Sequence, residues 1–174
     1  MIHVNETGYR AGDILTACDN ELHVPTGYLG HSAIVVDGEH VVEAVITFPY
    51  VQLGRIDDFV RLHPKHAWYR PVRPQLGSAA AAYAVQYLRS SEANYAQGVL
   101  VPPFSFSPRI PLQDPWSSIY CSKLVWLSYF YGAGYPFYND FFLFTPEDLD
   151  TVLSRDPNFQ LLYKHPGFYF VIDT

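Results

Sequence analysis

The sequence predicts one α+β domain, in which a curved antiparallel sheet or partial barrel carries helices packed on one side. Two β-branched runs flank Asp37-Gly38, which is a strong hairpin signal. An alanine-rich stretch over residues 75–90 has the composition of a long helix. The chain has 174 residues, 49% of them hydrophobic, and neither an internal repeat nor a linker divides it. We therefore expect a single domain over residues 1–174 with a core of its own.

Composition disfavours several classes of partner. The 11 lysines and arginines stand against 17 acidic residues, which gives a net charge of −6. This balance disfavours nucleic acids and anionic membrane surfaces, because both reward clustered positive charge. The aromatic share of 17% fits either a tightly packed small core or an aromatic-lined groove, and composition does not choose between them.

The two cysteines, Cys18 and Cys121, are too few for a disulfide framework. The N-terminus shows no positively charged start followed by an apolar run, and no apolar stretch reaches the roughly eighteen residues that span a bilayer. We therefore expect reduced thiols, no integral membrane segment and a cytoplasmic setting. The oligomeric state stays open.

The first half of the chain has the pattern of short strands and loops. Gly12-Asp13 turns the chain into the first strand, and alternating or continuous apolar runs mark the others. In order, we expect strands at residues 14–17, 31–36, 40–45, 50–53 and 67–70, a loop at 18–29 and a short helix at 56–60.

Two groups of residues in this half could suggest a metal site. Cys18 and His23 precede His31 closely, and His63 and His66 are three residues apart. Cys18 and His23 lack the paired close spacing of a zinc site. A lone His-x-x-His is a weak metal signal, and Pro64 disfavours a regular helix there. We expect no metal and no cofactor, and we interpret His63 and His66 as surface or structural histidines.

The second half is predicted to be helical around a proline-rich loop at residues 99–115, which has too many prolines for regular structure. We expect the helix over residues 75–90 to pack against a helix that is capped by Ser117 or Ser118 and ends at Gly132. The remaining predicted elements are an aromatic loop at residues 135–144, a helix from Thr145-Pro146 to Leu153, and strands at residues 159–163 and 167–172.

Cys121 falls in the first turn of the predicted helix that follows Ser118. There the unpaired backbone N–H groups and the positive end of the helix dipole stabilise a thiolate, the form of cysteine that attacks electrophiles. Cys121 is therefore a candidate nucleophile. The alternative is a structural cysteine, since free cysteines are often small core residues.

His31 and Glu43 lie on the two strands of the predicted hairpin, and the loop length decides whether their side chains meet. With a two-residue loop, His31 would face Ala44, and Glu43 would point to the opposite side of the sheet. We predict instead the three-residue loop Asp37-Gly38-Glu39. Ala33 then pairs with Glu43, and His31 becomes the diagonal neighbour of Glu43 at roughly 7–8 Å between backbones.

A carboxylate beside His31 would fix the tautomer of the imidazole and support its protonated form. An imidazole held in this way can take a proton from a thiol. The alternative for His31 is a strand-end histidine that is satisfied by a backbone carbonyl.

Five stretches of the chain, in their order, carry a resemblance to a known family. They are Gly12–Leu15, Gly30–Val35, Val42–Ala44, Tyr120–Val125 and Thr145–Leu149. Together they resemble the YiiX/YaeF-like family, the circularly permuted branch of the papain-like NlpC superfamily of cysteine peptidases and amidases. The permuted branch places the histidine and its polar partner before the cysteine, as this chain does.

The resemblance implies a permuted papain-like fold with the nucleophile at the N-terminus of a helix. By position, Cys121 matches the nucleophile, His31 the base and Glu43 the residue that orients the base. The implied activity is that of a thiol hydrolase, which cleaves an amide bond in a peptide-like or cell-wall-peptide-like substrate through an acyl-thioester. Lys123 departs from the family pattern, where an acidic residue is expected, and this bears on the substrate more than on the chemistry.

Four aromatic residues around Cys121 are candidates for substrate binding: Phe104, Phe106, Trp116 and Tyr120. The first three would form an apolar wall of a substrate groove, and packing under the helix is the alternative. The backbone N–H of Cys121 is the predicted oxyanion donor. A second donor is not named by the sequence, because Tyr120 points about 100° away from Cys121 on a helix and is expected to pack.

Two other functions are compatible with the same residues. The enzyme could transfer acyl groups among lipids or thiols, or act as a lipase, on the same Cys–His–Glu triad. The domain could also bind a peptide-like ligand without catalysis, and Cys121 would then have the reactivity of an ordinary thiol. The natural substrate and the choice between hydrolysis and transfer stay open.

Overall fold

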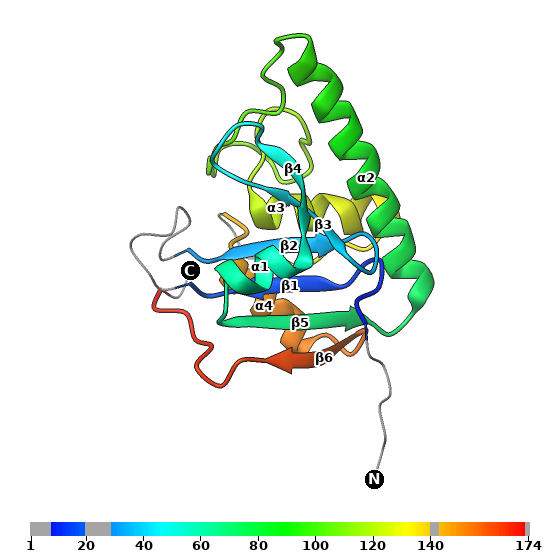
Figure 1. The fold of residues 1–174 in the computed structure, drawn as a ribbon, viewed down its shortest axis with the longest axis vertical. Coiled ribbons are helices and arrows are strands. Elements are labelled where there is room, and N and C mark those ends of the chain that lie inside the picture. Colours follow the sequence, from blue (N-terminus) through cyan, green and yellow to red (C-terminus); the bar gives the residue numbers. More distant parts are fainter. Residues whose placement is uncertain (1–7, 20–28, 140–142, 173–174) are drawn as a thin grey trace.

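The computed structural model describes residues 8–19, 29–139 and 143–172, which form one antiparallel sheet with helices on both faces (Figure 1). The strand order is β4-β3-β2-β1-β5-β6, and the sheet is open between its edge strands β4 and β6. The strands are β1 (Ile14–Ala17), β2 (His31–Val35), β3 (His40–Ala44), β4 (Val51–Arg55), β5 (His66–Pro71) and β6 (Phe159–Lys164). The helices are α1 (Ile56–Leu62), α2 (Pro74–Ala96), α3 (Cys121–Leu127), the π-helix η1 (Ser128–Gly132) and α4 (Pro146–Arg155).

The predicted α+β class and antiparallel sheet are confirmed, and most predicted elements are present with shifted ends. The strand predicted at residues 167–172 is wrong, because the chain turns after β6 through a bond from the Phe168 N–H to the His165 carbonyl and does not pair again. The prediction that helices pack on one side is also incomplete. Helices α2, α3 and α4 cover one face of the sheet, whereas α1 packs on the other.

The larger core lies between the sheet and helices α2, α3 and α4. Strand residues such as Ile14, Ile34 and Tyr69 belong to one cluster with Leu124 and Leu127 of α3, and all five are fully buried. On β3 and on β5, the members of this cluster are two residues apart, as expected for one face of a pleated sheet. Burial of this face fixes α3 against β2 at the middle of the sheet.

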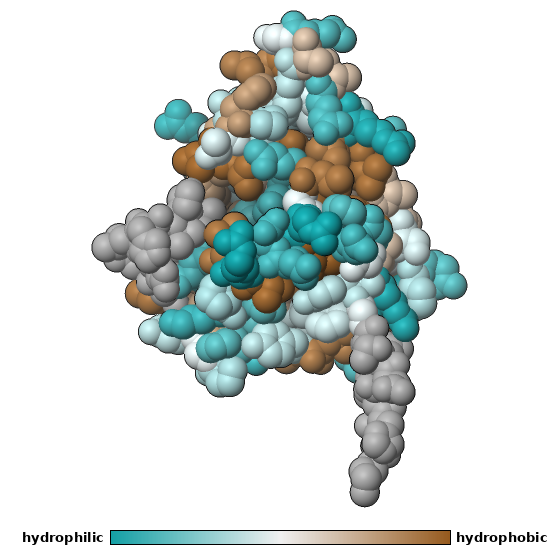
Figure 2. All heavy atoms as spheres, viewed as in Figure 1, coloured by the Kyte–Doolittle hydropathy of each residue, from teal (hydrophilic) through white to brown (hydrophobic). Residues whose placement is uncertain are grey.

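A smaller core lies on the opposite face, under α1. Ile56 and Phe59 pack there against Leu15, Ala33 and Val41. The outer side of α1 is largely hydrophilic, as Figure 2 shows. The sheet is therefore apolar on both faces in its central strands, and the short helix covers the side that the long helices leave uncovered.

Helix α2 closely approaches η1, which continues α3 at its C-terminal end, as the alanines of α2 predict. A Cβ atom on Gly132 would lie 2.5 Å from the Ala79 carbonyl oxygen and 3.0 Å from the Ala80 Cα. Only a glycine fits at this contact, and small residues on α2 allow it. The predicted packing between the two helices is confirmed, and its contact lies mainly on η1.

Helix α4 begins as the sequence predicts, with Thr145 as N-cap and Pro146 in the first turn. The Thr145 hydroxyl accepts the Asp148 N–H at 3.2 Å, and the Asp148 carboxylate accepts the Thr145 N–H at 2.7 Å. This reciprocal capping satisfies two N–H groups at the helix start. The capping fixes the start of α4, the helix that contacts α3.

The described part of the chain contains no helix that is both long and apolar enough to cross a membrane.

Replacing Leu124 with alanine should lower the free energy of unfolding by about 2–5 kcal/mol, because the side chain is fully buried between α3 and the sheet. Urea unfolding monitored by circular dichroism measures the change. Leu62→Ala is the matched control, since that leucine is 58% exposed, and it should change the free energy by no more than about 0.5 kcal/mol. Equal losses in the two variants would contradict the position of α3 in the core.

Candidate active site

The start of α3 is set by the proline-rich loop. The Ile119 N–H donates to the Pro103 carbonyl at 2.9 Å, and the Ser105 N–H donates to the Ile119 carbonyl at 3.0 Å. These bonds hold residue 119 beside Phe104 as a short parallel bridge, and Tyr120 keeps an extended backbone. The helix therefore begins at Cys121.

The predicted cap by Ser117 or Ser118 is wrong. Tyr120 occupies the N-cap position, and no side chain caps this helix. Because residue 119 is held in the bridge to the loop, the chain becomes helical only after Tyr120, and neither serine reaches the first turn as a cap. The Ser118 hydroxyl accepts the Lys123 ammonium at 3.2 Å instead. Cys121 is the first helical residue, so its predicted place in the first turn is confirmed.

The hairpin between β2 and β3 has the predicted register. Ile34 pairs with Val42 and Val35 with Val41, and the Val36 N–H donates to the His40 carbonyl at 2.9 Å. This pairing leaves Asp37-Gly38-Glu39 as the three-residue loop. The Asp37 carboxylate accepts the N–H groups of both Glu39 and His40 at 2.8 Å, which stabilises the turn.

The two strands separate beyond the Ile34–Val42 pair, and this opening is where the site lies. Within the described residues, no ladder pair joins β2 and β3 at Ala33 or beyond. His31 and Glu43 project on the α1 face of the sheet, as Ala33 and Val41 do, whereas Cys121 comes from α3 on the other face. Because the strands no longer pair here, side chains from both faces can meet between them.

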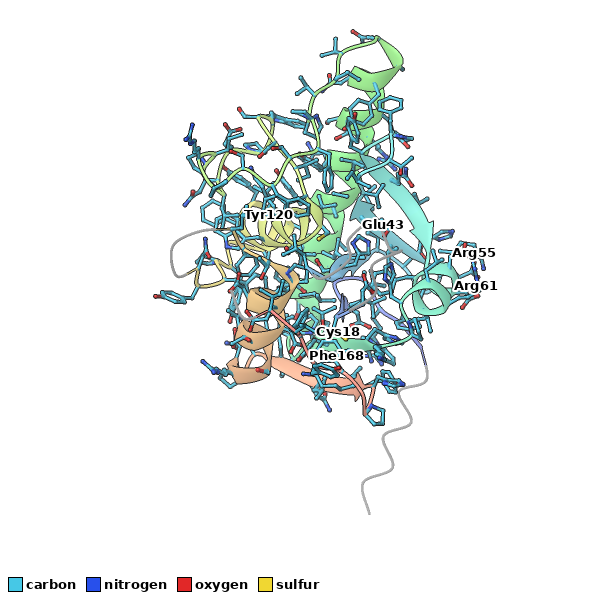
Figure 3. All side chains as sticks on the ribbon, turned by 90° about the vertical axis from the view of Figure 1, so that its left-hand side faces the viewer. Cys18, Glu43, Arg55, Arg61, Tyr120 and Phe168 are labelled. Carbon is cyan, nitrogen blue, oxygen red and sulfur yellow. The ribbon has the colours of Figure 1, made fainter. Side chains whose placement is uncertain are left out.

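Glu43 and His31 form the closest polar contact of the site. The Glu43 carboxylate lies 2.6 Å from His31 Nε2, with side-chain exposures of 18% and 2%. The predicted diagonal contact across the hairpin is confirmed. Figure 3 places Glu43 on the strands and Tyr120 beside α3, on different elements around the site.

The second ring nitrogen of His31, Nδ1, is available to the thiol. It is buried and has no hydrogen-bond partner of ordinary geometry in the described part of the chain. Cys121 is close enough to interact with the imidazole through a side-chain hydrogen bond and through charge. The structure therefore brings Cys121, His31 and Glu43 together, although they come from three elements.

The pKa values of the site shift in complementary directions. Burial lowers the pKa of His31, but Cys121 and Glu43 outweigh burial and raise it to about 10. Burial raises the pKa of the Cys121 thiol, and the His31 imidazolium outweighs this and lowers it. Burial likewise raises the pKa of Glu43, and His31 lowers it below the ordinary value. These directions favour a thiolate–imidazolium pair at neutral pH.

A second histidine packs against His31, and the sequence did not indicate it. The ring centroid of His63 lies 4.9 Å from that of His31, and Phe59 stacks on His31 at 5.5 Å. His63 Nδ1 lies 2.6 Å from the Asp19 carboxylate. His63 and His66 are both buried. Of the two predicted roles, surface or structural, the structural one therefore applies. No local sequence pattern predicts the contact between His63 and His31, because it depends on where α1 ends against the sheet.

Three of the four predicted substrate-binding residues lie together. Phe104 and Phe106 are half-buried and contact edge to face at 5.2 Å, and Phe106 contacts the Tyr120 ring at 5.2 Å. The Tyr120 hydroxyl accepts the Phe144 N–H at 3.2 Å, so this side chain packs. Trp116 lies apart from them and stacks on Tyr87 of α2 at 4.7 Å.

Lys123 is almost fully buried on α3, which the sequence did not predict. Burial lowers the pKa of its ammonium to about 8, and Asp114 opposes this shift. Its bond to Ser118 connects α3 with the end of the proline-rich loop. The Lys123 side chain therefore helps to hold the end of the proline-rich loop against α3.

A pocket of about 660 Å³ reaches the edge of the site at Tyr120. Trp126 of α3 and Phe130 of η1 line it, together with the proline-rich loop and residues 136–139. No charged side chain is among its described lining residues. Cys121 itself is 1% exposed, and the more accessible member of the site is Glu43.

The fold and the site define an α+β protein with a cysteine, a histidine and a glutamate at an opening of an antiparallel sheet. In fold, the chain is similar to the crystal structure of the metalloprotein YiiX from Escherichia coli O157:H7, DUF1105, with a TM-score of 0.53 and 16% sequence identity. The match covers 90% of this chain and 97% of that one. The expected likeness to YiiX is confirmed for the fold, and the permuted papain-like relation stays a prediction. No family model matches the chain, and no curated protein matches it.

YiiX is a metalloprotein, and the described residues of this chain do not form a comparable cluster of metal ligands. Within residues 8–19, 29–139 and 143–172, no group of three or more His, Cys, Asp or Glu side chains could hold a metal ion. His63 and Cys18 point to other partners, the Asp19 carboxylate and the Lys65 carbonyl. His23 lies outside the described residues.

Gly54 of β4 leaves the space that Glu43 occupies, because a Cβ atom there would lie 2.7 Å from Glu43 Oε1. Gly54→Ala should displace the carboxylate from His31 and raise the pH at which Cys121 becomes reactive. Alkylation of Cys121 by iodoacetamide across pH, followed by mass spectrometry, measures this midpoint. Gly38→Ala is the matched control in the hairpin loop, where the nearest atom is 3.9 Å away. A midpoint unchanged by Gly54→Ala would show that Glu43 does not act on the pair.

Proposed function

We propose that the protein is a thiol hydrolase of the cysteine peptidase or amidase type, with Cys121 as nucleophile, His31 as acid and base, and Glu43 as the residue that orients His31. The contact that carries this proposal is the 2.6 Å hydrogen bond between Glu43 and His31 Nε2, which leaves Nδ1 to the thiol. A carboxylate on one ring nitrogen and a thiol near the other is the arrangement of an activated cysteine nucleophile. The family resemblance in the sequence supports the same roles.

The reaction begins from the thiolate and the imidazolium. The Cys121 sulfur attacks the carbonyl carbon of an amide, and a carbon–sulfur bond forms as the carbonyl π pair moves to oxygen. The backbone N–H of Cys121, at the first position of α3, donates to this oxyanion. When the carbon–nitrogen bond breaks, the leaving nitrogen takes the proton from His31.

Release of the acyl group uses the same residues, and His31 now acts as the base. Neutral His31 takes a proton from water, the hydroxide attacks the thioester carbon, and the carbon–sulfur bond breaks to restore the thiolate. Glu43 supports each imidazolium state by accepting the Nε2 proton in a hydrogen bond. Because Glu43 is the carboxylate that faces this ring, its loss should affect both halves of the reaction.

Acyl transfer is the second candidate function, and the pocket at Tyr120 favours it. The described lining of this pocket is uncharged, and most of it is aromatic, aliphatic or proline, as a lipid acyl chain requires, while Ser107, Gln113 and Asn139 are polar. Assays with a peptide-like amide and with an acyl ester separate the two candidates, because a transferase passes the acyl group to an added thiol or alcohol faster than to water.

Cys121 should react with iodoacetamide well below the pH at which an ordinary thiol does, because His31 lowers its pKa. Mass spectrometry after partial labelling measures both cysteines in one sample. Cys18 is the internal control, since it is equally buried and burial raises the pKa of its thiol. His31→Ala should slow Cys121 labelling at pH 7 at least about tenfold. Equal reactivity of the two cysteines would favour a binding module without catalysis.

Hydrolysis should depend on pH as the pair dictates. The active form needs a thiolate, whose pKa His31 lowers below the ordinary value of 9.0, and an imidazolium, which is lost as the pH rises through about 10. The rate should therefore rise with pH at a midpoint below 9.0 and fall as the pH passes about 10. Cys121→Ala should abolish turnover, and Glu43→Gln should reduce it about 10- to 100-fold. Steady-state kinetics on a fluorogenic peptide amide provide the measurement, and turnover by Cys121→Ala would disprove the proposed nucleophile.

A further inference from the structure

Ser32 of β2 carries a buried hydroxyl that the mechanism above does not use. The residue is 0% exposed, and its Oγ has no hydrogen-bond partner of ordinary geometry within the described residues. Buried hydroxyl groups are almost always paired, because an unpaired one loses its bonds to water without replacement. An unpaired buried hydroxyl beside a nucleophile suggests a hydrogen-bond donor that finds its acceptor in another state of the site.

The side chain of Ser32 points toward the nucleophile helix. It lies on the same face of β2 as Ile34, two residues further on, which packs against Leu124 of α3. Its neighbour across β1 is Thr16, whose hydroxyl already donates to Asp150 at 3.2 Å. Ser32 interacts with the sulfur of Cys121, and after burial and His31 this hydroxyl is a further influence on the thiol, lowering its pKa.

The other hydroxyl beside the sulfur is committed elsewhere. Ser122 follows Cys121 on α3, and its Oγ donates to the Phe144 carbonyl at 2.6 Å. Its proton is therefore used in holding the start of α4 near α3. Ser32 is left as the side-chain donor that is free to turn toward a bound group.

We propose that the Ser32 hydroxyl is the second hydrogen-bond donor to the oxyanion, opposite the backbone N–H of Cys121. This inference rests on the proposed thiol hydrolase function. The oxyanion lies two bonds from the sulfur, so a hydroxyl that interacts with the sulfur stays within reach of that oxygen. Ser32 keeps its own proton throughout: it donates a hydrogen bond as the carbonyl π pair moves to oxygen, and His31 alone supplies the proton to the leaving group.

The test separates attack on a carbonyl from simple alkylation. An activated acyl ester that releases p-nitrophenol forms an oxyanion when Cys121 attacks. In alkylation, the sulfur instead displaces iodide from the CH2 carbon of iodoacetamide, and no oxyanion forms. Both rates are measured at the pH plateau where the thiolate is fully formed, which removes any effect on the thiol pKa. Ser32→Ala should lower the plateau rate of acylation about 100- to 1,000-fold and leave the plateau rate of alkylation within about twofold.

Two variants complete the experiment. Ser32→Thr keeps a hydroxyl and should recover most of the acylation rate. Ser128→Ala removes another buried hydroxyl, which donates to the Leu124 carbonyl one helical turn earlier, and should leave both rates unchanged. Circular dichroism melts confirm that each variant is folded.

Several outcomes would overturn the assignment. Acylation by Ser32→Ala at the level of Ser128→Ala would remove Ser32 from the oxyanion, while the thiol hydrolase function would stand. Equal losses of acylation and alkylation would place the effect on the thiolate or on packing instead. If Cys121→Ala released p-nitrophenol as fast as the unaltered protein, the proposed function itself would fail, and the role of Ser32 with it.

Discussion

The hydrogen bond between His31 and Glu43 is the interaction on which the site depends. It exists because the loop between β2 and β3 has three residues, which places both side chains on one face of the sheet. A loop shorter by one residue would send Glu43 to the other face and leave a buried imidazole without its carboxylate. Glycine at position 54 of the next strand then leaves room for that carboxylate. The chemistry of the site is thus built on the register of one hairpin.

The sulfur reaches this hairpin because two unrelated constraints agree. Residues 103–105 hold Ile119 in an extended bridge, which delays the start of the helix until Cys121. Burial of Leu124 and Leu127 against the sheet then fixes the helix beside β2. Separation of β2 from β3 beyond Ile34 lets a side chain from the helix face meet one from the α1 face. None of these features alone would bring a thiol to an imidazole.

Burial gives the pair its electrostatic character. A buried imidazole and a buried thiol each favour the neutral form, yet next to each other, with Glu43 on the far nitrogen, each favours the charged form. Both pKa shifts favour transfer of the thiol proton to the histidine.

The sequence by itself determined most of the elements and the hairpin register, because turn residues, alternating apolar residues and capping residues such as Thr145 act locally. It also placed Cys121 at a helix start and identified His31 and Glu43 as neighbours. Only the tertiary structure decided that the helix begins two or three residues later than the serines suggest, since a distant loop holds Ile119 extended. Only it placed His63 against His31, and turned the hydroxyl of Ser32 toward the sulfur without another partner. These contacts join residues far apart in the chain, and local sequence patterns do not predict which distant residues will meet.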